Sequence, residues 1–182
     1  MNPSSNLVFI GPTGAGKTSL GRRVAERFGL RFIDLDVLVS ELAGSSIGGL
    51  FEHLGEAGFR EHESRALARA LSGDGVLVAT GAGAVLAPAN RELMTRRAFV
   101  VHLHVSVQSQ VERLARDRSR PLLQRPDRDQ VLAGMAAQRD PLYRQLGQLC
   151  LDTDRFIPAE ATAQLVLQLA SQWQQLTPPS PA

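Results

Sequence analysis

The sequence GPTGAGKT spans Gly11 to Thr18 and directly follows the apolar run LVFI, Leu7 to Ile10. It is a complete G-x-x-x-x-G-K-[ST] phosphate loop between a strand and a helix. Its glycines let successive backbone N–H groups point at phosphate oxygens, where a Cβ atom would obstruct them. Lys17 would reach the β and γ phosphates, and the Thr18 hydroxyl can bind Mg²⁺. The stretch therefore predicts binding of a nucleoside triphosphate.

The segments around this loop predict an α/β fold. After the loop, Leu20, Val24 and Phe28 repeat at helical spacing until Gly29 ends the helix. Short apolar runs alternate with longer helical segments along the rest of the chain, which predicts a five-stranded parallel sheet with helices on both faces. The five expected strands are 7–10, 31–34, 76–80, 99–105 and 149–152.

Composition predicts one globular domain. The chain has 182 residues, 43% of them hydrophobic and 21% charged, and its net charge of +2 does not indicate a nucleic-acid partner. We expect one domain over 1–176 and a tail over 177–182. The strand begins too early for a signal peptide and no apolar run reaches membrane-spanning length, so we expect a cytoplasmic protein that does not bind membranes. Cys150 is the single cysteine, and its apolar neighbours predict a buried strand position.

Two segments interrupt the alternation of strands and helices. Residues 37–72 are too long for one crossover helix and contain several glycines, so we expect a helical insertion there. Residues 117–126 are polar, rich in arginine and bounded by prolines, which is typical of a lid loop.

Asp34 and Asp36 end the second expected strand and are candidates for phosphoryl-transfer chemistry. A period of two would place both carboxylates on the same side of the chain, at the strand end where α/β sheets bind ligands. One could hold water on the metal ion and the other could accept a hydrogen bond from an attacking hydroxyl. The alternative for either residue is a helix N-cap.

Three further features could complete a site. The third strand leads into a turn of small residues, Gly81 to Ala84, which brings backbone N–H groups close to anything above the sheet. Arg60 lies in the helical insertion and Arg139 near the end of a later helix. An arginine pair could hold a carboxylate in a bidentate manner, although either arginine could instead be a surface ion-pair residue.

Other candidates have simpler interpretations. His102 and His104 share a strand face but have no third ligand nearby in the sequence, so we expect packed histidines and no metal site. Trp173 is expected to anchor a terminal helix against the sheet. His53 and His62 lie among Glu52, Glu56, Glu61 and Glu63, for which we expect a solvated charged face.

Taken together, the chain resembles the shikimate kinase family, which belongs to the nucleoside-monophosphate-kinase-like phosphate-loop proteins. The resemblance extends from Leu7 to about Trp173 and rests on ordered motifs. It implies a three-layer phosphate-loop kinase fold and a monomer that phosphorylates the 3-hydroxyl of shikimate with ATP and Mg²⁺, on the route to chorismate and the aromatic amino acids. The motifs are the phosphate loop, Asp34-x-Asp36, Phe59-Arg60, Gly81 to Ala84, Arg120-Pro121-Leu122-Leu123 and Arg139-Asp140-Pro141-Leu142-Tyr143.

The resemblance also implies roles on the ATP side. Thr18 would bind Mg²⁺ directly and Asp34 would hold it through water. Lys17 and the lid residue Arg120 would neutralise the transferring phosphoryl group, while Arg113 and the segment around Phe156 to Pro158 would flank the adenine. The implied ATP-binding residues are Gly14, Ala15, Gly16, Lys17, Thr18, Ser19, Arg113, Arg120 and Phe156.

On the substrate side, the resemblance implies that Asp36 binds the 3-hydroxyl of shikimate and that Arg60 and Arg139 hold its carboxylate. Gly81 and Ala82 would contribute backbone contacts. The catalytic residues would be Lys17, Asp36 and Arg120.

The chain departs from the family pattern at one point, because Ala82 stands where the family usually has the second of three glycines. Its methyl group would be harmless at negative φ and costly at positive φ. The alternatives to shikimate phosphorylation are a related small-molecule kinase, such as a gluconate kinase, and a ligand-sensing module without catalysis.

Overall fold

The computed structural model describes residues 5–115 and 127–173, and its centre is one sheet of five parallel strands. The strands are β1 (Leu7–Ile10), β2 (Arg31–Asp34), β3 (Val76–Ala79), β4 (Phe99–His104) and β5 (Leu149–Asp152), in the spatial order β2-β3-β1-β4-β5. All five predicted strands are present, although β3 and β4 each end one residue earlier than expected. The strand that leads into the phosphate loop is central, with β3 and β4 as its neighbours.

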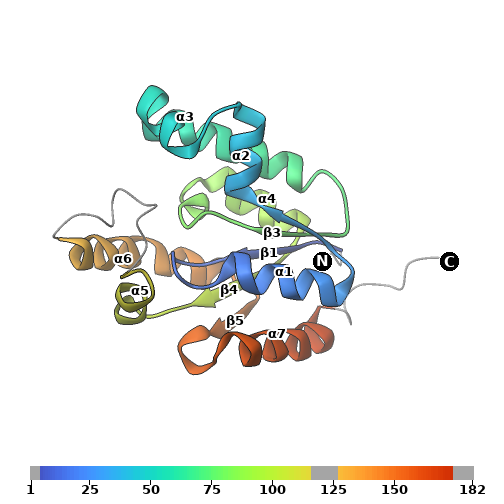
Figure 1. Cartoon of the computed structure of the whole chain (residues 1–182). Helices are drawn as coiled ribbons and strands as arrows, with labels where there is room; N and C mark the ends of the chain where they lie inside the picture. The colour runs from blue at the N-terminus through green and yellow to red at the C-terminus, as the bar shows by residue number, and fades with distance from the viewer. Residues whose placement is uncertain (1–4, 116–126, 174–182) are drawn as a thin grey trace.

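Helices cover both faces of the sheet, which gives the three-layer arrangement visible in Figure 1. Helices α1 (Lys17–Phe28) and α7 (Pro158–Gln172) pack on one face, around Leu7, Phe9 and Leu103. Helices α3 (Ile47–Ala70), α4 (Pro88–Arg97) and α6 (Arg128–Leu146) pack on the other face, around Val8 and Val78. The short helix α5 (Val107–Arg113) contacts α6.

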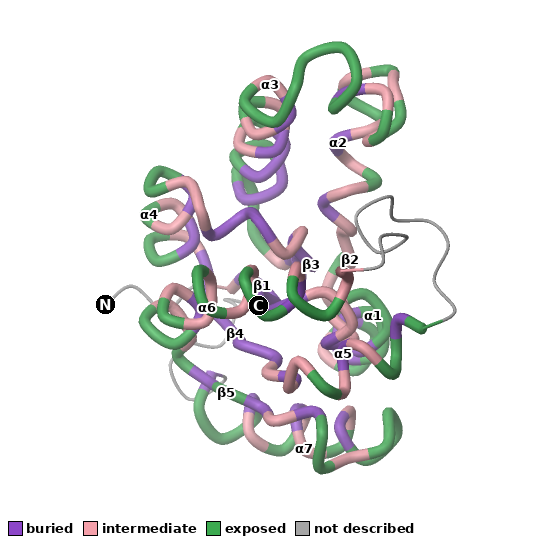
Figure 2. The backbone as a smooth tube through the Cα atoms, turned by 90° about the vertical axis from the view of Figure 1, so that its left-hand side faces the viewer, coloured by how far each residue is buried: buried purple, intermediate pink, exposed green. Residues whose placement is uncertain are grey.

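The expected helical insertion consists of two helices, α2 (Leu35–Ala43) and α3. Helix α2 begins two residues before the predicted start, directly after β2. Helix α3 is kinked at Gly55, where φ is 66°. Figure 2 shows that the end of this pair farthest from the sheet is largely exposed, whereas β1 and β4 are buried.

Two short 3₁₀ helices follow strands β3 and β5. The segment η1 (Ala84–Leu86) follows β3, and η3 (Thr153–Arg155) follows β5. None of the helices in the described part of the chain is both long enough and apolar enough to cross a membrane.

The structure bears on four residues to which the sequence analysis gave no part in the site. Trp173 is buried, as expected for an anchor. Its ring contacts the ring of Phe28 edge-on, with the ring centroids 5.4 Å apart. His102 is buried and His104 partly buried, and within the described ranges no group of three or more histidine, cysteine or acidic side chains could hold a metal ion. The prediction for Cys150 was wrong, because β5 is an edge strand and the residue is exposed.

Candidate active site

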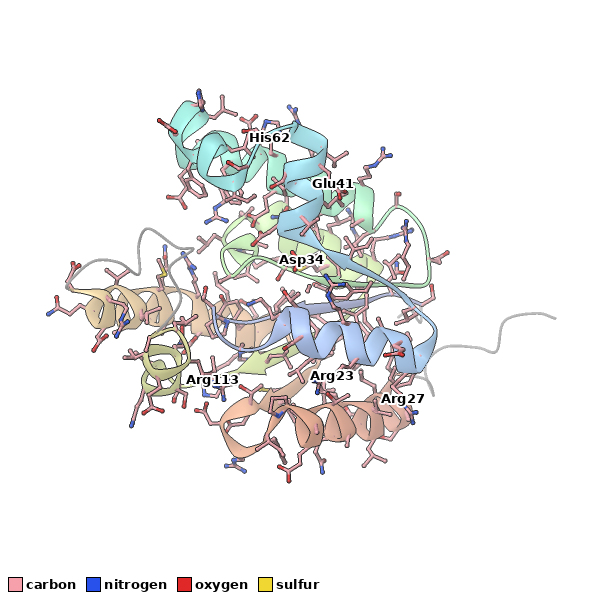
Figure 3. The ribbon with its side chains drawn as sticks, in the orientation of Figure 1. Arg23, Arg27, Asp34, Glu41, His62 and Arg113 are labelled. Carbon is pink, nitrogen blue, oxygen red and sulfur yellow. The ribbon has the colours of Figure 1, made fainter. Side chains whose placement is uncertain are left out.

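A cleft of about 470 Å³ opens where β1, β2 and β3 end. Its wall combines the phosphate loop and the start of α1 with the two aspartates after β2 and the small-residue turn after β3. Figure 3 shows Asp34 in this region, between α1 and α2. The lining residues used below are Thr13, Gly14, Gly16, Lys17, Thr18, Ser19, Asp34, Asp36, Gly81 and Ala82.

The phosphate loop has the backbone geometry that anion binding requires. Gly16 has φ 86° and precedes α1 without any side-chain cap on the helix. The first N–H groups of α1 therefore remain available to a ligand, and the positive end of the helix dipole points the same way. Lys17 Nζ donates hydrogen bonds of 2.8 Å to the carbonyl oxygens of Gly11 and Pro12, which hold its ammonium group at the loop.

Asp34 connects the phosphate loop to α2. Its Oδ2 atom accepts a 2.8 Å hydrogen bond from Thr18 Oγ1. Its Oδ1 atom accepts from the backbone N–H groups of Asp36, at 3.1 Å, and Val37, at 3.4 Å, which makes it the N-cap of α2. The two interpretations of Asp34 are therefore compatible, because one oxygen caps the helix and the other faces the proposed metal ligand Thr18.

Asp36 lies in the cleft, but the predicted reason was wrong. We expected it to continue the strand with a period of two, whereas it lies in the first turn of α2. Both aspartates still line the cleft because the chain turns into a helix directly after β2. The carboxylate of Asp36 lies next to Gly81, since a Cβ atom at position 81 would be 3.0 Å from Asp36 Oδ1.

Arg60 is held by two glutamates of its own helix. Its Nη1 atom lies 2.8 Å from Glu63 and its Nη2 atom lies 3.2 Å from Glu56. The guanidinium group also lies against Gly83, and Nε is buried without a hydrogen-bond partner among the residues described. Arg60 is therefore a fixed, partly buried cation at the turn after β3.

The expectation of a solvated charged face was wrong for Glu63. Its side chain is only 1% exposed, and it lies beside Gly81, where a Cβ atom would be 3.0 Å from Glu63 Oε1. Burial raises the pKa of the Glu63 carboxyl, and the charge of Arg60 opposes that rise. The only sequence signal was its place three residues after Arg60, where two side chains meet on one helix face. His53 is exposed and His62 partly buried on the same helix.

Arg139 of α6 lies near the same turn, on the cavity that Ala82 also lines. A small cavity of about 10 Å³, lined by Thr13, Ala82 and Tyr143, adjoins its side chain. Its Nε atom is buried without a hydrogen-bond partner in the described part of the chain. Ala82 has no positive φ, so its methyl group causes no backbone strain. The structure thus brings Arg60, Arg139, Asp36 and Ala82 to one end of the sheet.

Arg113 joins the phosphate loop to the end of β5. Its Nη1 atom donates to the Gly14 carbonyl at 3.1 Å and to Thr153 Oγ1 at 2.9 Å. Its Nη2 atom donates to the Thr153 carbonyl at 2.9 Å and lies 3.4 Å from Asp154. Figure 3 labels this residue beside α5. Phe156 follows η3 and packs partly buried against the α1–α7 face of the core. Arg120 and the expected lid at 117–126 lie outside the described residues.

Comparisons with known proteins agree with this geometry. A family model described as shikimate kinase matches residues 13–170. A protein named shikimate kinase from Stenotrophomonas maltophilia (strain R551-3) is 64% identical, over 96% of this chain and 97% of that protein. One from Xanthomonas axonopodis pv. citri (strain 306) is 59% identical, over 99% of this chain and all of that protein. Among solved structures, the shikimate kinase from Acinetobacter baumannii in complex with shikimate has a TM-score of 0.86 and 37% identity, and the alignment covers 94% of this chain and 96% of that one.

Proposed function

The chain belongs to the shikimate kinase family, and on that premise we propose how its cleft transfers the γ-phosphoryl group of ATP to the 3-hydroxyl group of shikimate. One observation carries the proposal: a phosphate loop and a pair of arginines flank the same turn after β3. The loop suits a triphosphate, whereas Arg60 and Arg139 suit a second, smaller anion. Asp36 lies between these two regions.

ATP would bind with its phosphates on the residues from Gly14 to Ser19. The uncapped N–H groups at the start of α1 support this placement, because they offer hydrogen-bond donors and a favourable dipole to an anion. Lys17 would leave the carbonyl oxygens that now accept its hydrogen bonds and would contact the β and γ phosphates. Arg113 fixes Gly14 relative to Thr153, so it would set the position of the loop beside the adenine region near Phe156.

The oxygen atoms of Thr18 and Asp34 fit a Mg²⁺ ion. Mg²⁺ prefers hard oxygen ligands and usually keeps several waters and phosphate oxygens, so a site with few protein ligands is expected. The existing hydrogen bond between Thr18 and Asp34 supports this assignment, because it already brings the two oxygens to 2.8 Å from each other beside the loop. Thr18 would bind the ion directly and Asp34 would hold one of its waters. When bound, the ion neutralises charge on the β and γ phosphates.

Shikimate would bind across the turn after β3. Arg60 and Arg139 would hold its carboxylate, and a role in ligand binding is supported by their Nε atoms, which are buried without a hydrogen-bond partner among the described residues. Asp36 would accept a hydrogen bond from the 3-hydroxyl, and the backbone of Gly81 and Ala82 would contact the ring substituents. Because phosphoryl transfer passes through a loose transition state, Asp36 orients the hydroxyl more than it removes its proton.

Charge on the transferring phosphoryl group would be stabilised by Lys17 and by Arg120 from the lid. Closure of the lid would exclude water, which otherwise competes with shikimate as the acceptor. We further propose that the enzyme works as a monomer in the cytoplasm, with ATP and shikimate as its partners. Its product would enter the synthesis of chorismate and the aromatic amino acids.

A coupled ADP-release assay tests the proposal. We expect turnover with ATP, Mg²⁺ and shikimate, and little turnover with gluconate or without an acceptor. Omission of Mg²⁺ should remove the activity. If ATP bound but shikimate failed to stimulate ADP release, the acceptor assignment would be wrong.

A further inference from the structure

Tyr143 is the last residue of the motif that begins at Arg139, but the proposed chemistry gives it no task. It lies on α6, four residues after Arg139, so both side chains emerge from the same face of the helix. The tyrosine is only 1% exposed. Its hydroxyl donates a hydrogen bond to the backbone carbonyl of Ala82, in the turn that borders the cleft.

This hydrogen bond fixes the orientation of one peptide plane. The Ala82 carbonyl and the N–H group of Gly83 belong to the same planar peptide and point in opposite directions. Fixing the carbonyl therefore also fixes Gly83, and the guanidinium group of Arg60 lies against Gly83. Through this peptide plane, Tyr143 on α6 influences the position of the Arg60 side chain on α3.

Arg139 interacts electrostatically with the same hydroxyl group. Burial raises the pKa of Tyr143, and the charge of Arg139 opposes that rise. The hydroxyl therefore keeps its proton under ordinary conditions and can donate it to Ala82. Arg139 and Tyr143 also line the same small cavity as Thr13 of the phosphate loop.

The ring of Tyr143 is held from behind by a histidine. His102 stacks on it with ring centroids 5.3 Å apart and an interplanar angle of 28°. Gly147, directly after α6, packs closely on His102, since a Cβ atom at position 147 would lie 2.8 Å from the histidine Cβ. This close packing restricts the Tyr143 ring and thereby keeps its hydroxyl next to the Ala82 carbonyl.

We propose that Tyr143 is a positioning residue that sets the spacing of Arg60 and Arg139, and thereby the affinity for the carboxylate of shikimate. This inference rests on the proposed function, which assigns the carboxylate to those arginines. Tyr143 would not touch the reacting atoms. Its loss should therefore weaken substrate binding more than it slows phosphoryl transfer.

The test compares Tyr143→Phe with the wild type. The variant keeps the ring that stacks on His102 and removes only the hydroxyl. We expect the KM for shikimate to rise about fivefold to tenfold, while kcat and the KM for ATP stay within about twofold. The matched control is Trp173→Phe, another buried aromatic change, which lies on the opposite face of the sheet and should alter stability without this selective effect.

A double-mutant cycle with Arg139→Lys separates positioning from a purely structural role. If the hydroxyl acts through the arginines, Tyr143→Phe should have a much smaller effect on the KM for shikimate in the Arg139→Lys background. An unchanged KM in the single variant, or an equal loss in every kinetic constant with a lower melting temperature, would overturn the inference. Failure of the proposed function would look different, because the wild type itself would then show no shikimate-dependent ADP release.

Discussion

The guanidinium group of Arg60 lies against Gly83, in the space that a side chain at position 83 would need. Arg60 cannot simply move away, because Glu63 and Glu56 hold it from its own helix. Arg60 is therefore placed by its own helix together with a glycine that lies 23 residues later in the chain. This relationship leads to the first prediction.

Gly83→Ala should displace Arg60 and raise the KM for shikimate by about tenfold or more, with a much smaller change in the KM for ATP. Steady-state kinetics with each substrate varied in turn measures both constants. Gly134→Ala is the matched control, because a Cβ atom on that glycine of α6 would meet nothing within 4 Å. The control should be active and slightly more stable, since alanine favours helix by up to about 1 kcal/mol. A normal KM for shikimate in Gly83→Ala would contradict this placement of Arg60.

Glu63→Gln should change how stability depends on pH. Burial raises the pKa of Glu63 above its ordinary value of 4.5, so the folded protein holds this proton more tightly than the unfolded chain does. The stability that this tighter proton binding adds to the folded state is fully present below pH 4.5 and is lost as the pH rises through the pKa of Glu63 in the folded protein. The stability of the wild type minus that of the variant should therefore fall as the pH rises from about 4 to about 8.

Urea unfolding of both proteins across this pH range measures the difference. The variant should also show a higher KM for shikimate, because Arg60 loses one ionised partner. A stability difference that stayed constant or grew with pH would show that the Glu63 pKa is not raised in the folded state.

Arg113→Ala should weaken ATP binding and leave shikimate binding nearly unchanged. The side chain joins the Gly14 carbonyl to Thr153, so its removal frees the phosphate loop from the end of β5. We expect the KM for ATP to rise about fivefold or more. Arg155→Ala is a suitable control, because that arginine is 76% exposed and pairs only with Asp152 among the described residues. Equal effects from both substitutions would argue against a specific role for Arg113.

Ala82→Gly should change the KM for shikimate by less than about tenfold, because the backbone N–H group is present in both proteins. Ala82 has no positive φ, so a glycine relieves no backbone strain there. The same kinetic assay measures the effect. A KM for shikimate about a hundredfold lower in the variant would mean that the methyl group obstructs the substrate.

The sequence was most informative where local chemistry determines structure. The phosphate loop, all five strands and the helical insertion follow from glycine positions and apolar periodicity, and the structure confirms them. Asp36 was placed in the correct cleft for the wrong reason, because the side chain of Asp34 caps a helix that begins directly after β2. A strand period cannot anticipate such a cap.

The remaining differences depend on contacts between distant segments. Glu63 is buried only because α3 packs next to the turn after β3, and its periodicity alone resembles that of a surface residue. Cys150 looks like a core residue from its neighbours, but it lies on an edge strand, and edge position depends on strand order. The role proposed for Tyr143 likewise depends on a contact with Ala82, 61 residues earlier in the chain.

The most direct test of the account is shikimate-dependent ADP release by the wild type, Asp36→Asn and Asp74→Asn. Asp74 precedes β3 and so lies at the end of the sheet opposite the cleft, which makes it a matched carboxylate control. The account predicts full turnover in the wild type and in Asp74→Asn, and a loss of about a hundredfold or more in Asp36→Asn while ATP still binds. Turnover in Asp36→Asn equal to that of the wild type would contradict the assignment of the acceptor site.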